Sequence, residues 1–223
     1  MNCLSGVTVV GLTGQTGAGK TTISKIFSEN GFTIIDADKV ARKVVEKGSN
    51  CLYEIEELFG REILNDDETL DRKALAAIVF TDKAKLETLN TIMHPYITKE
   101  ILSMIKENSN NGVRLILLDA PTLFESHADD FCEIIISVLA DENVREQRII
   151  ARDGITHEQA RQRMDSQYSD EFFMSHSDYI IRNDGDIETV AKISREVSDK
   201  IKDCYLSNDS EMISNSAKAV VAE

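Results

Sequence analysis

Residues 14–21 carry the spacing of a phosphate-binding loop, Gly-x-x-x-x-Gly-Lys-Thr. Glycines such as Gly17 and Gly19 let successive backbone N–H groups converge on phosphate oxygens, because a side chain there would block their approach. In this motif Lys20 reaches the β- and γ-phosphates, and the hydroxyl of Thr21 binds Mg²⁺. The pattern therefore indicates chemistry on the terminal phosphate of a nucleotide, with ATP and Mg²⁺ as the expected cofactors.

The residues on either side of the loop favour this interpretation over a flexible Gly/Thr turn that matches by chance. The apolar run of residues 7–10 predicts a strand before the loop, and Ile23, Ile26 and Phe27 follow at helical spacing. Such a helix directs its positive N-terminal end at the phosphates. The predicted nucleotide-binding residues of this segment are Gly14, Gly17, Ala18, Gly19, Lys20, Thr21 and Thr22.

Phosphoryl transfer also needs a group that orients the acceptor or takes its proton. Asp38 lies just past a predicted strand, where its carboxylate could accept a hydrogen bond from an acceptor hydroxyl. Arg42 follows at i+4, so on a helix the two would share one face and Arg42 could bind an anionic substrate. The alternative is that Asp36 and Asp38 cap a helix with Arg42 as a surface partner. For Asp36, capping and function both stay open.

Further charged groups could serve the phosphates. Asp119 ends an apolar strand, where an Asp can hold Mg²⁺, although an ordinary turn residue is an equal alternative. Arg148 and Arg152 form an i, i+4 pair that could present two guanidinium groups to one phosphate chain, unless they belong to a solvated helix face. Of the next two arginines, Arg163 is the better candidate for phosphate binding and Arg161 the surface member.

Short apolar segments alternate with amphipathic ones and predict the elements that position these residues. Strands are expected within residues 7–10, 32–38, 114–121, 133–141 and 178–185. Strands separated by helices imply an α/β fold, with a parallel β-sheet flanked by helices. Ligands of such sheets bind at the carboxyl ends of the strands, where the phosphate loop, Asp36, Asp38, Asp119 and Asn183 fall.

The chain is expected to form one domain over residues 1–206, with two helical additions. Residues 39–112 show helical spacing and no convincing strand, which predicts an inserted substrate-binding subdomain facing the nucleotide site. Residues 143–173 are a second helical stretch, rich in arginine, that could close over the phosphates as a lid. Residues 207–223 are rich in Ser, Asn and Ala, which predicts a disordered tail.

Composition excludes several classes of function. The 223 residues are 42% apolar, enough for one good core, and the formal charge of −14 argues against a nucleic-acid partner. The four cysteines are scattered without metal-ligand spacing, which predicts reduced thiols and no structural zinc. No apolar run approaches the roughly 20 residues of a membrane span. We expect a soluble cytoplasmic protein, a monomer or weak oligomer, that acts on a small molecule.

The four histidines contribute less to the argument. His94 precedes Pro95 within the predicted helical insert, and a residue before proline is disfavoured in helical geometry. The sequence therefore predicts a bend of the chain at this point. No catalytic Ser/His/Asp order is visible.

In its motifs and their order, the chain resembles the dephospho-CoA kinase family from Val7 to about Tyr205. The resemblance rests on the phosphate loop and on "IIDADKVARKVVEKG", "LDRKALAAIVF" followed by "LNTIMHPYI", "LDAPTLFES", "RDGITHEQARQRMDSQ" and "DYIIRNDG". The phosphate loop alone suits many kinases. The Asp-Ala-Asp…Ala-Arg run, followed by His-Pro and then Pro-x-Leu-Phe-Glu, is much more specific.

The resemblance implies a P-loop kinase fold in which ATP phosphorylates the ribose 3′-hydroxyl of 3′-dephospho-CoA, giving CoA and ADP in the last step of coenzyme A biosynthesis. It implies that Asp38 is the base, that Arg148 meets ATP from the lid, and that Asn183 and Gly185 lie beside the adenine. The implied substrate contacts are Asp36, Asp38, Arg42, His94, Leu123, Phe124 and Glu125.

Two residues depart from the pattern of the family. Gln15 stands where a second glycine is more usual, and Thr122 stands where an apolar residue is usual. Both could alter fit or rate, but neither removes a group that the chemistry requires.

Three alternatives to this function stay open. The first is another small-molecule kinase, acting on a nucleoside monophosphate or a short hydroxy acid. The second is a nucleotide-dependent switch or assembly ATPase, against which the sequence lacks an Asn-Lys-x-Asp guanine motif and has its arginine-rich lid in the same chain. The third is a non-catalytic CoA-binding module, against which the retention of Lys20, Thr21 and Asp38 speaks.

Overall fold

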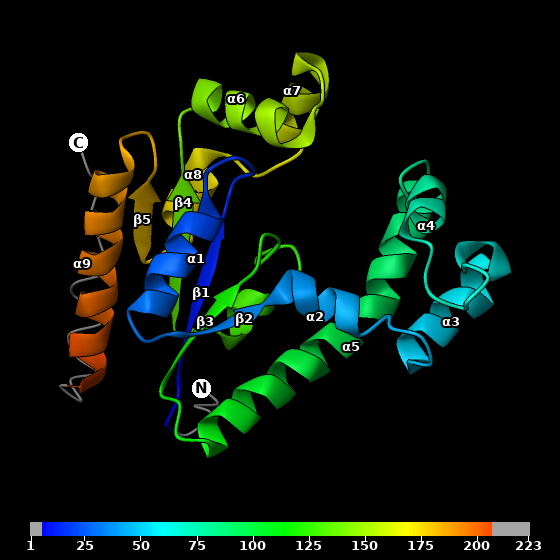
Figure 1. Cartoon of the computed structure of the whole chain (residues 1–223), viewed down its shortest axis with the longest axis horizontal. Helices are drawn as coiled ribbons and strands as arrows, with labels where there is room; N and C mark the ends of the chain where they lie inside the picture. The colour runs from blue at the N-terminus through cyan, green and yellow to red at the C-terminus, as the bar shows by residue number, and fades with distance from the viewer. Residues whose placement is uncertain (1–5, 207–223) are drawn as a thin grey trace. The chain divides into compact units, whose positions relative to one another are not determined.

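The computed structural model describes residues 6–206 (Figure 1). The predicted tail of residues 207–223, like Cys3, lies outside the described residues. The chain divides into two compact units, one formed by Met1–Ile35 with Ser109–Glu223 and the other by Asp36–Asn108.

A five-stranded sheet is the centre of the first unit. Its strands lie in the order β2 (Thr33–Asp36), β3 (Leu115–Asp119), β1 (Thr8–Gly14), β4 (Ile134–Leu139) and β5 (Tyr179–Arg182). β1 pairs in parallel with β3 and β4, and β4 pairs in parallel with β5. All residues of the central strand except Thr8 are buried. The predicted α/β fold class is confirmed, and the parallel strands bring their carboxyl ends to one edge.

Helices cover this sheet and close its core. They are α1 (Lys20–Glu29), α6 (Glu142–Asp153), α7 (His157–Asp165), α8 (Asp170–Ser175) and α9 (Ile187–Leu206), with a 3₁₀ turn at Ala128–Phe131. Ile23 and Phe27 of α1 and Val197 of α9 pack in one apolar cluster with Leu12 and Val138 of the sheet. α1 and α9 lie side by side, and α6 and α7 lie beyond the carboxyl ends of the strands (Figure 1).

The second unit is helical and has an apolar core of its own. Its elements are α2 (Ala37–Lys43), α3 (Asn50–Phe59), a 3₁₀ turn at Arg61–Ile63, α4 (Arg72–Val79) and α5 (Lys83–Asn110), whose last two residues belong to the first unit. The core is built by Val45, Cys51, Ile55, Ile63, Leu75, Val79 and Leu89. Side chains cap its helices: Ser49 accepts from the N–H of Leu52, and Asp71 from that of Ala74.

Pro95 lies inside α5, and the bend predicted before it stays a prediction about the course of that helix. α5 continues through His94 and Pro95 for 28 residues. Apolar side chains are buried on both sides of the proline, Leu89 before it and Ile101 and Ile105 after it. Packing of one helix against apolar surface at both ends offsets the about 3 kcal/mol that an interior proline costs.

Within residues 6–206, no helix combines the length and the apolar character that crossing a membrane requires.

We expect Gly14→Ala to destabilise the first unit. Gly14 has φ +143°, and an added Cβ would lie 2.2 Å from the carbonyl oxygen of Val138 on β4. Overpacking of this kind costs about 1–3 kcal/mol, which lowers the melting temperature of a chain this size by about 2–12 °C. Gly112→Ala is the control, because φ there is +81° but an added Cβ meets open space. Equal shifts of the two variants in thermal unfolding would contradict the assigned contact with β4.

Candidate functional site

The loop between β1 and α1 has the backbone course of a phosphate cradle. Gly19 adopts a left-handed conformation, φ +91° and ψ +31°, directly before α1, and no side chain of the described residues caps that helix. The N–H of Thr22 already bonds the carbonyl of Gly19 at 3.1 Å. The N–H groups of Lys20 and Thr21 come before it, at the start of a ten-residue helix, where an anion can accept hydrogen bonds from them.

Close neighbours show that this course depends on glycine. An added Cβ at Gly17 would lie 2.7 Å from the carbonyl oxygen of Arg145, and one at Gly19 would lie 2.2 Å from the amide nitrogen of Asn183. The donor groups of the loop also match the oxygens of a nucleotide triphosphate. The residues present therefore fit ATP.

Asn183 holds the loop from the end of β5. Its amide donates to the carbonyl oxygen of Ala18 at 2.7 Å, and its backbone N–H donates to Leu139 of β4 at 2.8 Å. Asn183 is buried, whereas Gly185 is exposed. The structure therefore gives Asn183 a role in bracing the loop, and the implied position of both residues beside the adenine stays a prediction.

Arg148 reaches the phosphate loop from α6. Its Nη1 lies 3.4 Å from the carbonyl oxygen of Gly17, to which it donates, and the side chain is half-buried. A guanidinium at this place adds a delocalised charge to the N–H donors of the loop. Of the arginines named from the sequence, Arg148 is the one that the structure brings to the loop.

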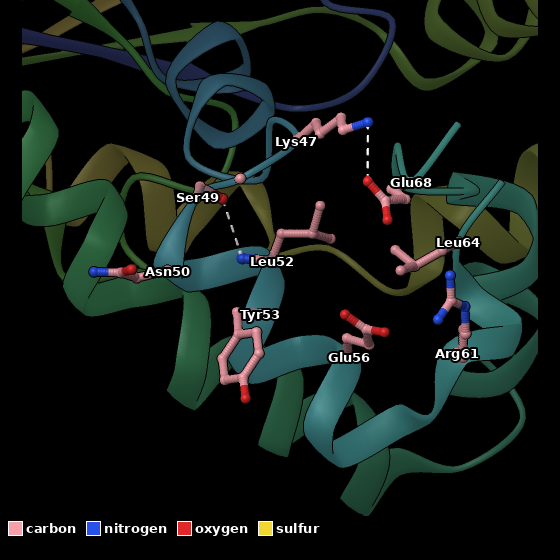
Figure 2. A pocket seen from close by; sticks show the side chains of 10 residues that line it. Lys47, Ser49, Asn50, Leu52, Tyr53, Glu56, Arg61, Leu64 and Glu68 are labelled. Carbon is pink, nitrogen blue, oxygen red and sulfur yellow. Dashed lines mark hydrogen bonds and ion pairs between the residues drawn. The ribbon is translucent and has the colours of Figure 1, made fainter. Parts of the chain in front are cut away.

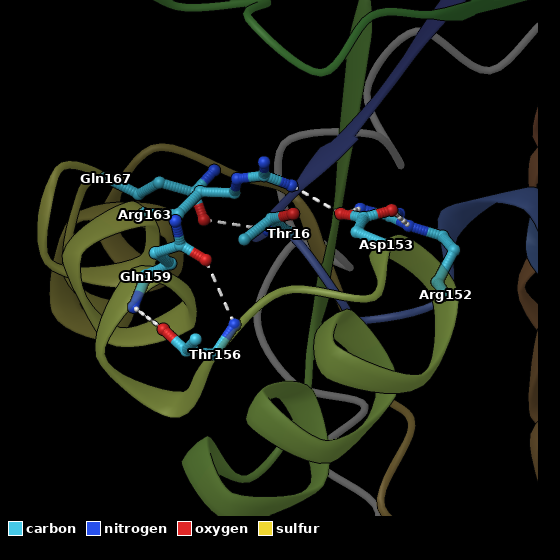
Figure 3. Close-up of polar contacts among 7 residues, drawn as sticks. All are labelled: Thr16, Arg152, Asp153, Thr156, Gln159, Arg163 and Gln167. Atoms are coloured by element: carbon cyan, nitrogen blue, oxygen red, sulfur yellow. Dashed lines mark hydrogen bonds and ion pairs between the residues drawn. The ribbon is translucent and has the colours of Figure 1, made fainter.

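The other lid arginines pair with carboxylates of α6, Arg152 within that helix and Arg161 and Arg163 from α7. Arg152 bonds the carboxylate of Asp153 with Nε at 2.7 Å and Nη2 at 2.8 Å, and Arg163 pairs with the same carboxylate (Figure 3). These hydrogen bonds, that of Arg152 first, hold the pKa of Asp153 down at about 2. Arg161 Nε bonds Glu146 at 3.0 Å. The preference for Arg163 over Arg161 as a phosphate ligand gains no support, since each has a carboxylate partner.

Two polar residues that bond the loop escaped the sequence analysis. Gln167 and Asp170, which follow α7, bond the loop at Thr16 and Gln15 respectively. Arg145 of α6 is buried behind it. Contacts between residues more than 150 positions apart leave no local pattern in the sequence. The one feature that could have pointed to them was the unusual glutamine at position 15.

Asp119 is the last residue of β3 and pairs in register with Leu12 of β1. Among the described residues, no group of three or more His, Cys, Asp or Glu side chains could hold a metal ion. Magnesium in kinase sites is typically held by one or two protein groups and the substrate phosphates, so Thr21 and Asp119 stay predicted ligands.

Within the helical unit, α2 places Asp38 and Arg42 one turn apart. Asp36 caps this helix by accepting the N–H of Lys39 at 3.0 Å, which confirms the capping role left open above. Asp38 and Arg42 are both exposed and so accessible to a ligand. His94 lies half-exposed on α5. Their substrate contacts stay predictions.

The segment after β3 carries the remaining predicted substrate residues. Leu123 is fully buried, and Phe124, 8% exposed, packs against Phe173 with ring centroids 6.0 Å apart. Glu125 is exposed. In this structure the first two side chains belong to the core of the first unit, so Glu125 alone of the three is openly accessible.

The helical unit also holds a pocket of about 300 Å³ between the start of α3 and the turn that follows it (Figure 2). Lys47 and Glu68 form an ion pair of 3.0 Å at one side, and Arg61 and Glu56 lie on facing sides. The lining also includes Ser49, Asn50, Leu52, Tyr53 and Leu64. The pocket combines both charges with apolar wall, and Asp38, Arg42 and His94 lie elsewhere in the unit.

The sequence matches known proteins over most of its length. The profile of the family described as dephospho-CoA kinase matches residues 8–189. A dephospho-CoA kinase of Fusobacterium nucleatum is 41% identical over 186 residues, which are 83% of this chain and 94% of that protein. A dephospho-CoA kinase of Corynebacterium glutamicum is 37% identical over 179 residues, 80% and 92% of the two chains.

Solved structures support the same relationship. The dephospho-CoA kinase of Campylobacter jejuni superposes with a TM-score of 0.67 at 28% identity, covering 86% of this chain and 96% of that one. A protein of Thermus thermophilus superposes with a TM-score of 0.74 at 27% identity, covering 87% and 97%. The fold and family predicted from the sequence are confirmed. By its sequence and its fold, the chain belongs to the dephospho-CoA kinase family.

Proposed function

We propose that this chain transfers the γ-phosphoryl group of ATP to the ribose 3′-hydroxyl of 3′-dephospho-CoA, giving CoA and ADP. The observation that carries the proposal is a glycine loop, shaped for phosphates and approached by Arg148, in a chain that matches the family over residues 8–189. The reaction breaks the bond between the γ-phosphorus and the bridging oxygen of ADP. The 3′-oxygen forms the new bond and loses its proton.

The phosphate loop has the role of binding and aligning the donor. The N–H groups of residues 17 and 19–21 and the ammonium of Lys20 would hold the β- and γ-phosphates, whereas the N–H of Ala18 donates to the carbonyl oxygen of Gln15 at 3.1 Å. Mg²⁺, for which Thr21 and Asp119 are the proposed ligands, supplies charge that neutralises the phosphates. Asn183 keeps the carbonyl of Ala18 turned into the protein, so that the loop directs N–H groups outward.

Arg148 has the role of stabilising the charge that spreads over the transferred group. The ion pairs of Arg161 and Arg163 with carboxylates of α6 fix α6 against α7 and so fix the base from which Arg148 extends. A preorganised guanidinium loses little free energy to reorganisation at the moment of transfer. Arg148 is therefore our candidate for the lid arginine that acts in the transition state.

Asp38 has the role of orienting the acceptor hydroxyl and taking its proton. Arg42, one turn further along α2, would bind an anionic group of the same substrate. The helical unit, with His94 on α5, would supply surface for the pantetheine arm, since an acceptor of this length extends beyond a nucleotide site. Its role as a substrate-binding insert and that of residues 143–173 as a lid are part of this proposal, as are a cytoplasmic location and a monomeric or weakly oligomeric state.

The first test is release of ADP from ATP and Mg²⁺ by the purified protein, with and without dephospho-CoA. Adenylate, cytidylate and shikimate serve as parallel acceptors, because they represent other small-molecule kinases. We expect release to depend on dephospho-CoA and the product to have the mass of CoA. Release that another acceptor stimulates, or that proceeds equally with none, would overturn the proposed reaction.

Replacing Asp38 by Asn should lower kcat by about 100-fold or more, since positioned acid–base groups contribute about 10²–10⁴-fold. The KM for ATP should stay within about threefold, because Asp38 belongs to the acceptor side. Asp66→Asn is the matched control, as Asp66 is an exposed aspartate of the same unit. Turnover of the Asp38 variant equal to that of the control would remove Asp38 from the base role.

Replacing Arg148 by Ala should lower kcat by about 100-fold or more, because charge stabilisation by such an arginine is worth about 10³-fold or more in related phosphoryl transfers. Arg161→Ala should keep kcat within about threefold, because His157 still pairs with Glu146 and Arg163 still joins α7 to Asp153 of α6. Steady-state kinetics on both variants separates the roles. The reverse order of losses would show that the wrong arginine has been assigned.

A further inference from the structure

Gln15 is a buried polar side chain inside the phosphate loop. It is 4% exposed. Its Nε2 donates to Asp170 Oδ1 at 2.9 Å and to the carbonyl oxygen of Tyr168 at 3.4 Å. The loop is therefore bonded to the start of α8 by a residue that phosphate binding itself does not require.

The next residue of the loop is bonded to the same segment. The backbone N–H of Thr16 donates to Oε1 of Gln167 at 2.8 Å (Figure 3). Residues 167–170 connect α7 to α8, and α7 is joined to α6 through Asp153 and Arg163. A continuous series of contacts thus runs from Gln15 through the base of the lid to the helix that carries Arg148.

Cations surround the carboxylate at the centre of this arrangement. Arg182 Nη2 of β5 lies 3.7 Å from Asp170 Oδ2. Arg145 is 7% exposed; burial lowers the pKa of its guanidinium, and the charge of Asp170 opposes that shift. Among the described residues, Gln15 Oε1 and the Nε and Nη1 of Arg145 have no hydrogen-bond partner.

Gln15 and Arg145 are the buried members of this cluster, whereas the side chains of Asp170 and Arg182 are 37% and 32% exposed. Buried ionic groups often contribute less to stability than apolar side chains of the same volume, and an unpaired buried polar atom costs about 1–3 kcal/mol. Directional bonds between the loop and residues 167–170 instead specify one relative orientation. We therefore attribute to the cluster a role in orienting the loop relative to residues 167–170 rather than in stabilising the fold.

We propose that Gln15 is a positioning residue, whose hydrogen bond to Asp170 fixes the base of the lid against the phosphate loop and thereby sets where Arg148 lies over the phosphates. The inference rests on the proposed function for its kinetic consequence. Its structural part, the coupling of the loop to residues 167–170, holds for any phosphoryl transfer at this loop.

The test is a double-mutant cycle between Gln15→Leu and Arg148→Ala. Because Gln15 acts through Arg148, Gln15→Leu should lower kcat about tenfold in the wild-type protein and less than about twofold in the Arg148→Ala protein. The KM for dephospho-CoA should change less than about twofold. Gln147→Leu is the matched control, since Gln147 is an exposed glutamine of α6. Equal losses in both backgrounds would overturn the proposal.

A second pair of variants tests the hydrogen bond itself. Gln15→Glu places two carboxylates together and should lower kcat more than Gln15→Leu does. Adding Asp170→Asn reverses the hydrogen bond: the new amide at position 170 donates to the new carboxylate at position 15, and the pair again carries a single negative charge. The double variant Gln15→Glu/Asp170→Asn should therefore regain at least half of the lost activity on a logarithmic scale. A double variant as impaired as Gln15→Glu would contradict a positioning bond.

Hydrogen exchange gives a readout without turnover. In the nucleotide-free protein, Gln15→Leu should speed exchange of the Thr16 amide and of peptides covering residues 154–170, whereas Gln147→Leu should not. Unchanged exchange in Gln15→Leu would overturn the coupling. If the wild-type protein failed to phosphorylate dephospho-CoA while exchange responded as expected, the proposed function would fail and the coupling would stand.

Discussion

The close approach of three neighbours to the phosphate loop is the constraint on which the structure depends. Positions 14, 17 and 19 meet the backbone of β4, the backbone of α6 and the side chain of Asn183 at distances that leave no room for a Cβ. The loop is therefore fixed by the sheet and the lid together. Donors for phosphate oxygens are in place before a ligand arrives, which is what preorganised stabilisation of charge requires.

The arginines of the lid also differ in what holds them in place. Carboxylates on α6 pair with Arg152 of the same helix and with Arg161 and Arg163 of α7, and the pairs of Arg161 and Arg163 join the two helices. Arg148 instead extends to the carbonyl of Gly17. The chain has a formal charge of −14, so the protein as a whole repels anions. Because the other lid arginines pair with carboxylates, Arg148 is the cation that this part of the lid places at the loop.

Local patterns in the sequence predicted much of this arrangement. Five apolar segments became five strands, the glycine spacing marked the loop, and Asp36 was recognised as a possible cap. α5 contains Pro95, and the burial of Leu89 and Ile101 on either side of the proline could not be predicted, because it is a tertiary effect. Gln167 and Asp170 were missed because they bond residues 151 and 155 positions away. What sequence could not supply was the set of partners that decides which arginine is held and which one reaches the loop.

The most direct measurement of the central claim is to follow the phosphoryl group itself. ATP labelled with ¹⁸O in its γ-phosphate would be incubated with dephospho-CoA and the protein, and the product would be analysed by ³¹P NMR and by cleavage with a 3′-nucleotidase. The account predicts one labelled phosphate on the ribose 3′-oxygen of the product. Label found only in inorganic phosphate, or on another oxygen of the acceptor, would contradict it.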